Sequence, residues 1–298
     1  AFSARAELIS YEGCDYAPTG AVAGLSGGKG WDGGWYQEAA GQDAFTVIPG
    51  GMTYTDGAQN LAVRGGAFKT VGRATGGTLK RKVLLTPDLT PLLTNSIYFG
   101  LAGTTNWFSF LARIDGPVMN IIGSATNFLG SQAIELNKAP IGTMENFERA
   151  FMGARPSLGA YDRGLSNKWL IGGFGGYTPN NGLYTGTVDI VSGQAVFYVA
   201  RFIFGAPTPS NMLATMWINP ALSNEPSDAA GLTPPAWNMM WQFLANPPEP
   251  RDWNAISING SLGVTFTNTT LAYLDEVRIG TTFRDVAPRD FEEAPIIQ

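Results

Sequence analysis

The segment Ala272–Gly280 (AYLDEVRIG) constrains the fold of this chain more than any other segment. It is rich in β-branched and aromatic residues and a Gly-Thr-Thr turn closes it, which predicts a β-strand. Alternation along a strand assigns Tyr273, Asp275, Val277 and Ile279 to one face, and Leu274, Glu276 and Arg278 to the other. Asp275 then stands in an apolar row, where an unpaired carboxylate is costly, so it needs a partner.

Similar strand-like runs recur along the whole chain, separated by turns of Gly, Pro, Asn and Asp. Trp107–Ile114 and Ala195–Phe204 are clear examples, whereas helical patterns are few and short, at Thr143–Phe151 and Trp237–Leu244. Many strands with regular turns predict an all-β antiparallel sandwich or barrel with long loops and one or two short helices. No linker divides the chain, so we expect a single domain over residues 1–286 and a polar C-terminal extension over residues 287–298.

Composition argues against several kinds of function. The chain has 19 Lys and Arg against 24 Asp and Glu, and its net charge of −5 argues against a nucleic-acid partner. The only run of cations, Lys80-Arg81-Lys82, is interpreted as a solvated strand end. The chain has no His and a single Cys, Cys14, which excludes a Ser-His-Asp triad, an intrachain disulfide and a Cys-based zinc site. The best apolar run, Ala195–Gly205, contains Arg201 and predicts a buried strand rather than membrane insertion.

Several segments, spread over most of the chain, match one known family. They are Tyr11–Tyr16, Gly27–Trp35, Trp107–Leu111, Val196–Arg201, Met216–Pro220 and Leu274–Thr282. In their order and spacing the chain resembles the concanavalin A-like, laminin-G-type jelly-roll proteins of bacterial secreted proteins, notably those of planctomycetes and verrucomicrobia.

The resemblance implies two curved antiparallel sheets packed face to face. It does not imply one activity, because such domains include glycan-binding, adhesive, structural and catalytic members. Cys14 stands where the family usually has an aromatic residue, and a small buried thiol is a reasonable substitute in a core. The insert Pro117–Gly153 has no clear counterpart, so we expect functions specific to this chain there.

A structural calcium ion is one way to compensate Asp275. In a sandwich of this type the N- and C-terminal strands are commonly neighbours, so Glu12 or Asp15 would approach Asp275 and supply the oxygen ligands that calcium prefers. The alternative is that Asp275 accepts backbone N–H bonds or pairs with an Arg, while Glu276 and Arg278 form an ion pair on their shared face.

Two Gly-rich segments contain the aromatic and amide side chains that sugar binding needs. One carries Trp31, Trp35 and Tyr36 with Asp32, although Trp31 and Trp35 also fit the ends of a core. The other, Gly172–Tyr184, supplies the predicted ligand-binding residues Phe174, Tyr177, Asn180, Asn181 and Tyr184.

The sequence favours a non-catalytic module over an enzyme. A retaining glycosidase on a strand face would need acids spaced as in E-x-D-x-x-E, and the chain has no such array. We expect a recognition or assembly module, secreted or at the cell surface with its signal peptide removed. Its partner would be a polysaccharide or other copies of itself. The alternative is a polysaccharide-active glycoside hydrolase or lyase on the same fold.

Overall fold

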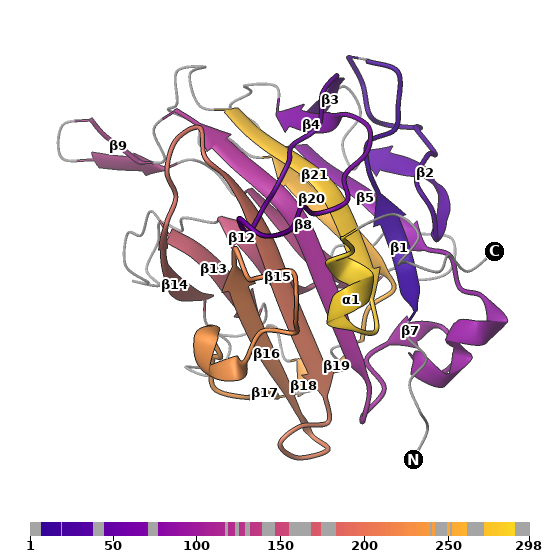
Figure 1. Cartoon of the computed structure of the whole chain (residues 1–298). Coiled ribbons are helices and arrows are strands. Elements are labelled where there is room, and N and C mark those ends of the chain that lie inside the picture. Colours follow the sequence, from indigo (N-terminus) through magenta and orange to yellow (C-terminus); the bar gives the residue numbers. More distant parts are fainter. Residues whose placement is uncertain are drawn as a thin grey trace.

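The computed structural model describes residues 7–18, 20–37, 45–70, 77–116, 119–122, 125–128, 132–138, 147–154, 168–173, 183–238, 240–241, 249–250, 252–260 and 271–289. In this part of the chain two antiparallel sheets pack face to face as a jelly-roll β-sandwich (Figure 1). The all-β, two-sheet fold class is therefore confirmed.

The larger sheet has eight strands and holds both ends of the fold. Its order is β17-β16-β15-β8-β21-β4-β3, and β1 also pairs with β21. The strands are β1 (Leu8–Glu12), β3 (Phe45–Ile48), β4 (Ala67–Thr70), β8 (Thr105–Asp115), β15 (Ala195–Phe204), β16 (Asn211–Ile218), β17 (Trp237–Asn238) and β21 (Leu271–Gly280). The antiparallel pairing of β1 with β21 confirms that the first and last strands are neighbours.

The smaller sheet has seven strands in the order β14-β13-β12-β11-β20-β5-β2. They are β2 (Trp31–Gln37), β5 (Gly77–Val83), β11 (Gln132–Lys138), β12 (Phe147–Ala154), β13 (Lys168–Gly173), β14 (Leu183–Asp189) and β20 (Ala255–Gly260). Two of its strands, β11 and β12, come from the insert Pro117–Gly153, so much of that insert belongs to the sheet.

Short elements lie around the two sheets. They are the strand pairs β6 (Leu93–Thr94) with β7 (Tyr98–Phe99), β9 (Met119–Ile122) with β10 (Ala125–Phe128) and β18 (Met240–Trp241) with β19 (Glu249–Pro250), and the helical turns η1 (Pro87–Leu92), η3 (Asp228–Ala230) and α1 (Phe283–Val286). The β9–β10 hairpin projects from one side of the sandwich (Figure 1). A capping box between Thr282 and Asp285 starts α1, because each side chain bonds the backbone N–H of the other.

Both predicted helices are wrong where the structure describes them. Phe147–Ala154 is strand β12, and the residues after Trp237 form the strands β17 and β18. β12 pairs with β11 on one side and β13 on the other. The hydrogen bonds of a central strand outweigh the weak local preference for a helix, which tertiary context commonly overrides.

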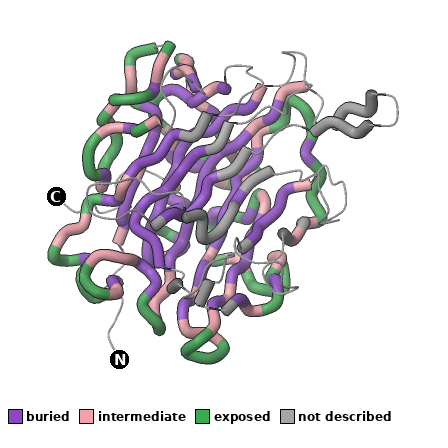
Figure 2. The backbone as a smooth tube through the Cα atoms, turned by 180° about the vertical axis from the view of Figure 1, so that it is seen from behind, coloured by how far each residue is buried: buried purple, intermediate pink, exposed green. Residues whose placement is uncertain are grey.

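Two apolar clusters hold the sandwich together. The first lies between the sheets and includes Phe108, Phe110, Tyr198, Ile256 and Trp253. The second lies on the outer face of the eight-stranded sheet and is described below. Seen from behind, the described residues of the strands are mostly buried, and the exposed residues lie mostly in the connections (Figure 2). Among the described residues, no helix is long and apolar enough to cross a membrane.

The second cluster makes one outer face of the sandwich apolar. It joins side chains of the eight-stranded sheet to two connecting segments and to α1. We call it the sealed face, and it comprises Met52, Leu61, Trp107, Leu111, Phe197, Val199, Trp217, Leu222, Tyr273, Phe283, Val286 and Ala287. Ala287, the first residue of the predicted C-terminal extension, is 2% exposed, and residues 290–298 of that extension lie outside the described part.

Strand β21 departs from the predicted alternation at a β-bulge. The register shifts between Asp275 and Arg278, and Glu276 has a φ of 56°. Before the bulge Leu274 faces the core and Tyr273 belongs to the sealed face, but beyond it Val277 also faces the core. The prediction that Tyr273 and Val277 share a face is therefore wrong, because the extra residue of the bulge shifts the alternation by one.

Candidate functional site

The outer face of the seven-stranded sheet is lined by polar side chains. Along its central strands Leu79, Ile134 and Ile256 point into the core, so the residues that alternate with them point away from it. We call this outer surface the polar face, and its described side chains include Asp32, Tyr36, Lys80, Lys82, Glu135, Asn137 and Ser257.

Four of these side chains form one continuous row across neighbouring strands. Glu135 of β11 lies opposite Ser257 of β20. Ser257 in turn lies opposite Lys80 of β5, and Lys80 lies opposite Tyr36 of β2. Directly opposed residues share a face and have Cβ atoms about 4.5–5.5 Å apart, so the row is continuous.

The row runs from a buried centre to an exposed edge. Ser257 is 0% exposed and Glu135 and Lys80 are 1% exposed, whereas Tyr36 in the edge strand is 49% exposed. Beside Tyr36, the exposed Asp32 lies opposite the half-buried Lys82. An accessible aromatic ring flanked by a carboxylate and an ammonium group is suited to a ligand with both apolar and polar surfaces.

Three buried side chains of the polar face are joined by hydrogen bonds that run in one direction. The side-chain amide of Asn137 donates to Oγ of Ser257 (2.7 Å) and to the backbone oxygen of Glu135 (3.2 Å). The Ser257 hydroxyl donates to Oε2 of Glu135 at 2.9 Å. Oδ1 of Asn137 is buried, and within the described part of the chain it accepts no hydrogen bond.

The described carboxylates of the polar face are too far apart for glycoside hydrolysis. Glu135 and Asp32 lie three strands apart in the sheet order. At about 4.8 Å per strand their backbones are roughly 14 Å apart. Retaining enzymes hold the two carboxyl groups about 5–5.5 Å apart and inverting enzymes about 6.5–9.5 Å apart. This pair therefore lacks the geometry of either mechanism.

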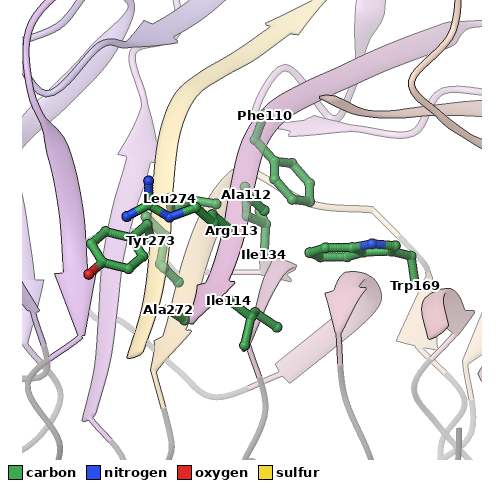
Figure 3. Close-up of a pocket in the computed structure, with 10 residues that line it drawn as sticks. Phe110, Ala112, Arg113, Ile114, Ile134, Trp169, Ala272, Tyr273 and Leu274 are labelled. Carbon is green, nitrogen blue, oxygen red and sulfur yellow. The ribbon is translucent and has the colours of Figure 1, made fainter. Parts of the chain in front are cut away.

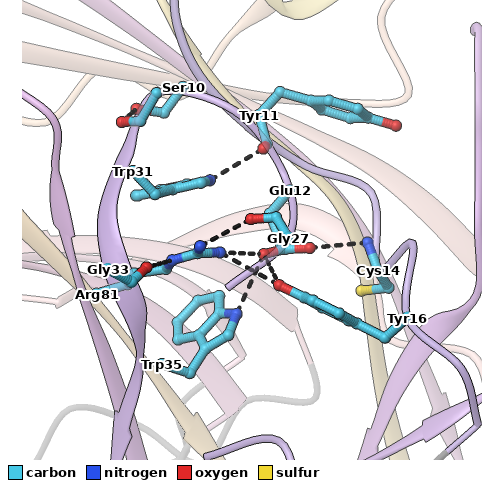
Figure 4. A network of polar contacts seen from close by, with 11 residues as sticks. Ser10, Tyr11, Glu12, Cys14, Tyr16, Gly27, Trp31, Gly33, Trp35 and Arg81 are labelled. Atoms are coloured by element: carbon cyan, nitrogen blue, oxygen red, sulfur yellow. Dashed lines mark hydrogen bonds and ion pairs between the residues drawn. The ribbon is translucent and has the colours of Figure 1, made fainter. Parts of the chain in front are cut away.

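On the core side of β5, Arg81 forms a buried ion pair with Glu12 of β1 (Figure 4). The distance from Nη1 of Arg81 to Oε2 of Glu12 is 2.6 Å, and the two side chains are 1% and 0% exposed. Glu12 also accepts hydrogen bonds from Tyr16, Trp35 and the backbone of Cys14. Burial raises the pKa of the Glu12 carboxyl, and the hydrogen bond from Tyr16 and the charge of Arg81 oppose that rise. The network ties the two sheets together.

This network corrects one prediction and confirms another. Lys80-Arg81-Lys82 is not a solvated strand end, because it lies within β5 and Lys80 and Arg81 are each 1% exposed. Trp31 and Trp35 are buried in the core, as the alternative interpretation predicted. Their rings lie 5.4 and 5.5 Å from the Arg81 guanidinium.

Asp275 finds its partners in the backbone. Its Oδ2 accepts the N–H of Met52 at 2.7 Å, and its Oδ1 accepts the N–H of Glu276 at 2.8 Å. Burial raises the pKa of Asp275 well above its usual range, and the charge of Glu276 raises it further. The ion pair between Glu276 and Arg278 is also confirmed, and both side chains are buried.

The predicted calcium ligands lie near one another but have other partners. Glu12 accepts hydrogen bonds from three side chains and one amide, and Asp275 accepts two amides. Asp15 is exposed. Within the described part of the chain, no three His, Cys, Asp or Glu side chains are grouped to hold a metal ion. The calcium site stays a prediction.

The predicted sugar-binding segment falls mostly outside the described residues. Phe174, Tyr177, Asn180 and Asn181 all lie there. Tyr184 is described and belongs to β14, where it lies opposite Ile171. Since Ile171 faces the core, Tyr184 faces the same side, and it packs against the inter-sheet cluster while remaining half-buried.

A small cavity lies at one end of the inter-sheet core (Figure 3). Its volume is about 20 Å³ and its lining includes Phe110, Ile114, Ile134 and Trp169. The indole Nε1 of Trp169 is buried and has no hydrogen-bond partner among the described residues. A cavity of this size holds about one water molecule, so it is too small for a sugar.

Of the polar face, only Tyr36 and Asp32 were named from the sequence as candidates for sugar binding, and its buried residues were not. Glu135 and Asn137 lie in the insert that was expected to carry a function specific to this chain, but no residue was named there. A signal did exist, because Ile134-Glu135-Leu136-Asn137 alternates apolar and polar residues as a half-buried strand does. The partners across the sheet, Ser257 and Lys80, depend on strand order, which alternation does not reveal.

Comparison with known proteins finds only distant structural likeness. No family model matches the chain, and no curated protein matches it. An endo-β-1,4-glucuronan lyase from the fungus Trichoderma reesei aligns with a TM-score of 0.44 at 13% identity, over 88% of this chain and 95% of that chain. The alginate lyase A1-II′, of polysaccharide lyase family 7, aligns with a TM-score of 0.38 at 11% identity, over 76% and 84% of the two chains. A botulinum neurotoxin type C structure, described by its interaction with two ganglioside molecules, has a TM-score of 0.38 at 11% identity, over 83% of this chain and 46% of that chain.

Proposed function

We propose that the protein is a non-catalytic recognition module, acting outside the cell or at its surface, that binds a polysaccharide across the polar face. The observation that carries the proposal is the exposed edge of that face, where Tyr36 is 49% exposed. The exposed Asp32 and the half-buried Lys82 lie beside it, so an aromatic ring, a carboxylate and an ammonium group share this edge. Sugar rings offer C–H faces to an aromatic ring and hydroxyls to polar side chains, so this edge matches both parts of such a ligand.

The roughly 14 Å between the Glu135 and Asp32 backbones supports binding rather than glycoside hydrolysis.

The test is retention on a panel of neutral and acidic polysaccharides in native affinity gels. Wild-type protein is expected to be retarded by at least one polysaccharide, and Tyr36→Ala is expected to lose most of that retardation. Leu101→Ala is the matched control, because it removes another exposed apolar side chain, which is 38% exposed and lies outside the polar face. Retardation by no polysaccharide, or equal loss in both variants, would contradict the proposal.

The same assay tests the predicted ligand-binding segment and the catalytic alternative. Tyr177→Ala reports on Phe174, Tyr177, Asn180, Asn181 and Tyr184, and loss of retardation in this variant would extend the binding surface to that segment. A lyase would release unsaturated products from a retained polysaccharide and a hydrolase would release new reducing ends. Either product would replace the non-catalytic proposal with the enzymatic one.

Self-assembly is a second candidate, favoured by one observation. Val188 in the edge strand β14 and Val191 just beyond it are 39% and 52% exposed. An edge strand with exposed apolar residues is a template for pairing with another chain. Assembly predicts filaments, sheets or high-mass species in native preparations, and a strict monomer at high concentration would contradict it.

The structural calcium ion at Glu12, Asp15 and Asp275 also remains part of the proposal. Bound calcium stabilises the state that binds it. A chelator is therefore expected to lower the melting temperature, and elemental analysis is expected to find calcium. An unchanged melting temperature together with no calcium would remove the ion from the account.

A further inference from the structure

Leu84 lies just beyond β5 and points to the same side of the sheet as Lys82. Val83 before it and Leu85 after it pack into the core between the sheets, so alternation turns Leu84 outward. Its backbone N–H donates to the carbonyl oxygen of Gly30 at 2.9 Å, which continues the pairing of β5 with β2. Leu84 is 44% exposed, so an apolar side chain lies open to solvent on the polar face.

The residue opposite Leu84 is a glycine, so no side chain from that position covers the leucine. Gly30 has a φ of 70°, in the left-handed region that favours glycine. A Cβ atom at Gly30 would lie 2.0 Å from the backbone oxygen of Ile9, so even an alanine would clash there. The bare position beside Leu84 is therefore fixed by the backbone.

Leu84 extends the exposed edge of the polar face into a strip with an apolar group at each end. Tyr36 lies opposite Lys80 in β5. At about 3.3 Å per residue, the step from Lys80 to Leu84 is roughly 13 Å, and it separates the two apolar groups along the strands. Asp32 and Lys82 lie opposite each other between them. We call Tyr36, Asp32, Lys82 and Leu84 the binding strip.

The binding strip carries no net charge, because the carboxylate of Asp32 and the ammonium group of Lys82 offset each other. The whole chain has a net charge of −5, so a polyanion gains no attraction at the strip and is repelled by the rest of the protein. A carboxylate accepts hydrogen bonds and an ammonium group donates them, whereas a hydroxyl does both. The charge and the chemistry of the strip therefore favour a ligand that is rich in hydroxyls and uncharged.

We infer that the binding strip takes a segment of several linked sugars from an uncharged polysaccharide, with Leu84 as the second apolar contact beside Tyr36. The inference rests on the proposed function, because it specifies the ligand of the same site. A single sugar cannot reach both apolar groups at their separation. Tyr36 and Leu84 cover the C–H faces of different rings, and Asp32 and Lys82 bind hydroxyls between them.

The experiment is calorimetric titration with soluble fragments of increasing length, taken from the neutral polysaccharide that wild-type protein retains most strongly. The affinity of wild-type protein is expected to rise until a fragment reaches from Tyr36 to Leu84, and then to level off. Leu84→Ala is expected to bind the long fragments about fivefold more weakly, because the apolar contact of a half-exposed leucine is lost. This variant is also expected to lose most of the gain in affinity with length.

Leu101→Ala is the matched control, because it truncates the same residue type at a similar exposure of 38%, away from the polar face. It is expected to bind every fragment as wild-type protein does. Thermal unfolding shows whether each variant is folded, and the length dependence of wild-type protein needs no variant. Native affinity gels at low ionic strength compare neutral with acidic polysaccharides, and the neutral ones are expected to retard wild-type protein more.

The outcomes separate this inference from the function beneath it. If Tyr36→Ala loses binding while Leu84→Ala binds like Leu101→Ala, the face binds glycans and Leu84 is not a contact. An affinity that does not change with fragment length, or stronger retardation by acidic polysaccharides, also overturns the inference and leaves the proposed function intact. If no polysaccharide retards wild-type protein, the proposed function fails and the inference fails with it.

Discussion

The two outer faces of the sandwich are built in opposite ways. The sealed face places Trp107, Phe197 and Trp217 outside the eight-stranded sheet and covers them with its own loops and α1. The rings of Trp107 and Trp217 stack with centroids 5.5 Å apart. The polar face places Lys80, Glu135 and Ser257 outside the seven-stranded sheet. A two-layer sandwich needs only its inner faces for a core, so the outer faces are free to differ.

The difference shows where stability and where recognition are expected to reside. Apolar groups on the sealed face contribute through burial, and their removal leaves cavities. At the exposed edge of the polar face, Tyr36 and Asp32 contribute little to burial and stay accessible to a ligand. Substitutions on the first face should therefore change the free energy of unfolding, and substitutions at the exposed edge of the second should change binding.

The largest loss of unfolding free energy is expected from a substitution on the sealed face. Phe197→Ala removes a side chain that is 0% exposed and lies 5.1 Å from the ring of Tyr54. The loss of a buried Phe costs about 3–5 kcal/mol. Urea denaturation measures the change in free energy of unfolding. A loss below about 0.5 kcal/mol, the usual range for surface sites, would show that the sealed face is not a second core.

A similar or slightly smaller loss of unfolding free energy is expected when the ion pair between the two sheets is broken. Arg81→Met leaves the Glu12 carboxylate buried without its cation, a change that costs about 3–5 kcal/mol. Lys82→Met, one position along the same strand but on the polar face, is the matched control. Urea denaturation of both variants checks the contrast, which fails if the two losses are equal.

The regions that these two substitutions probe differ in how well the sequence alone predicts them. Strand content was predictable, because alternation and turns are local signals, whereas the neighbouring first and last strands were expected only from the family resemblance. The faces of β21 were not predictable, because the bulge at Glu276 depends on pairing with β8. Lys80-Arg81-Lys82 was predicted to be a solvated strand end, because the run of cations alone does not indicate a buried partner. That partner for Arg81 is the carboxylate of Glu12, which is distant in sequence.

The candidate site was less predictable than the fold. Tyr36 and Asp32 stood in a segment recognised as possible sugar-binding material, and they lie at the exposed edge of the polar face. The row beyond them joins residues from β5, β11 and β20, and its continuity comes from sheet order. Sheet order is set by long-range pairing, and one sequence contains no direct record of it.

The free energy of unfolding is also expected to change gradually with pH. Burial and the charge of Glu276 raise the pKa of Asp275, which borders the sealed face through its bond to Met52. Above the unfolded-state pKa of about 4, the folded protein holds this proton more firmly than the unfolded chain. The free energy of unfolding is therefore expected to fall as pH rises from about 4 through the raised folded-state pKa.

Asp275→Asn isolates this contribution, because an amide does not titrate. The variant is expected to show a flatter dependence of unfolding free energy on pH than the wild type, measured by urea denaturation at a series of pH values. Identical slopes in the two proteins would contradict the assignment to Asp275.

The smallest effect on stability is expected at Tyr36. The side chain is 49% exposed, and Tyr36→Ala should change the free energy of unfolding by no more than about 0.5 kcal/mol. Circular dichroism during urea denaturation measures this value. A loss comparable to that of Phe197→Ala would show that the edge of the polar face is structural, and the contrast between the two faces would collapse.

Lysine labelling with and without ligand tests most directly whether the polar face is the binding surface. Lys82 is on that face and Lys69 is in β4 of the other sheet, and both are half-buried. Acetylation is followed by mass spectrometry in the absence and presence of the retained polysaccharide. Protection of Lys82 with unchanged labelling of Lys69 is the predicted result. Unchanged labelling of Lys82, or protection of Lys69 instead, would contradict the account.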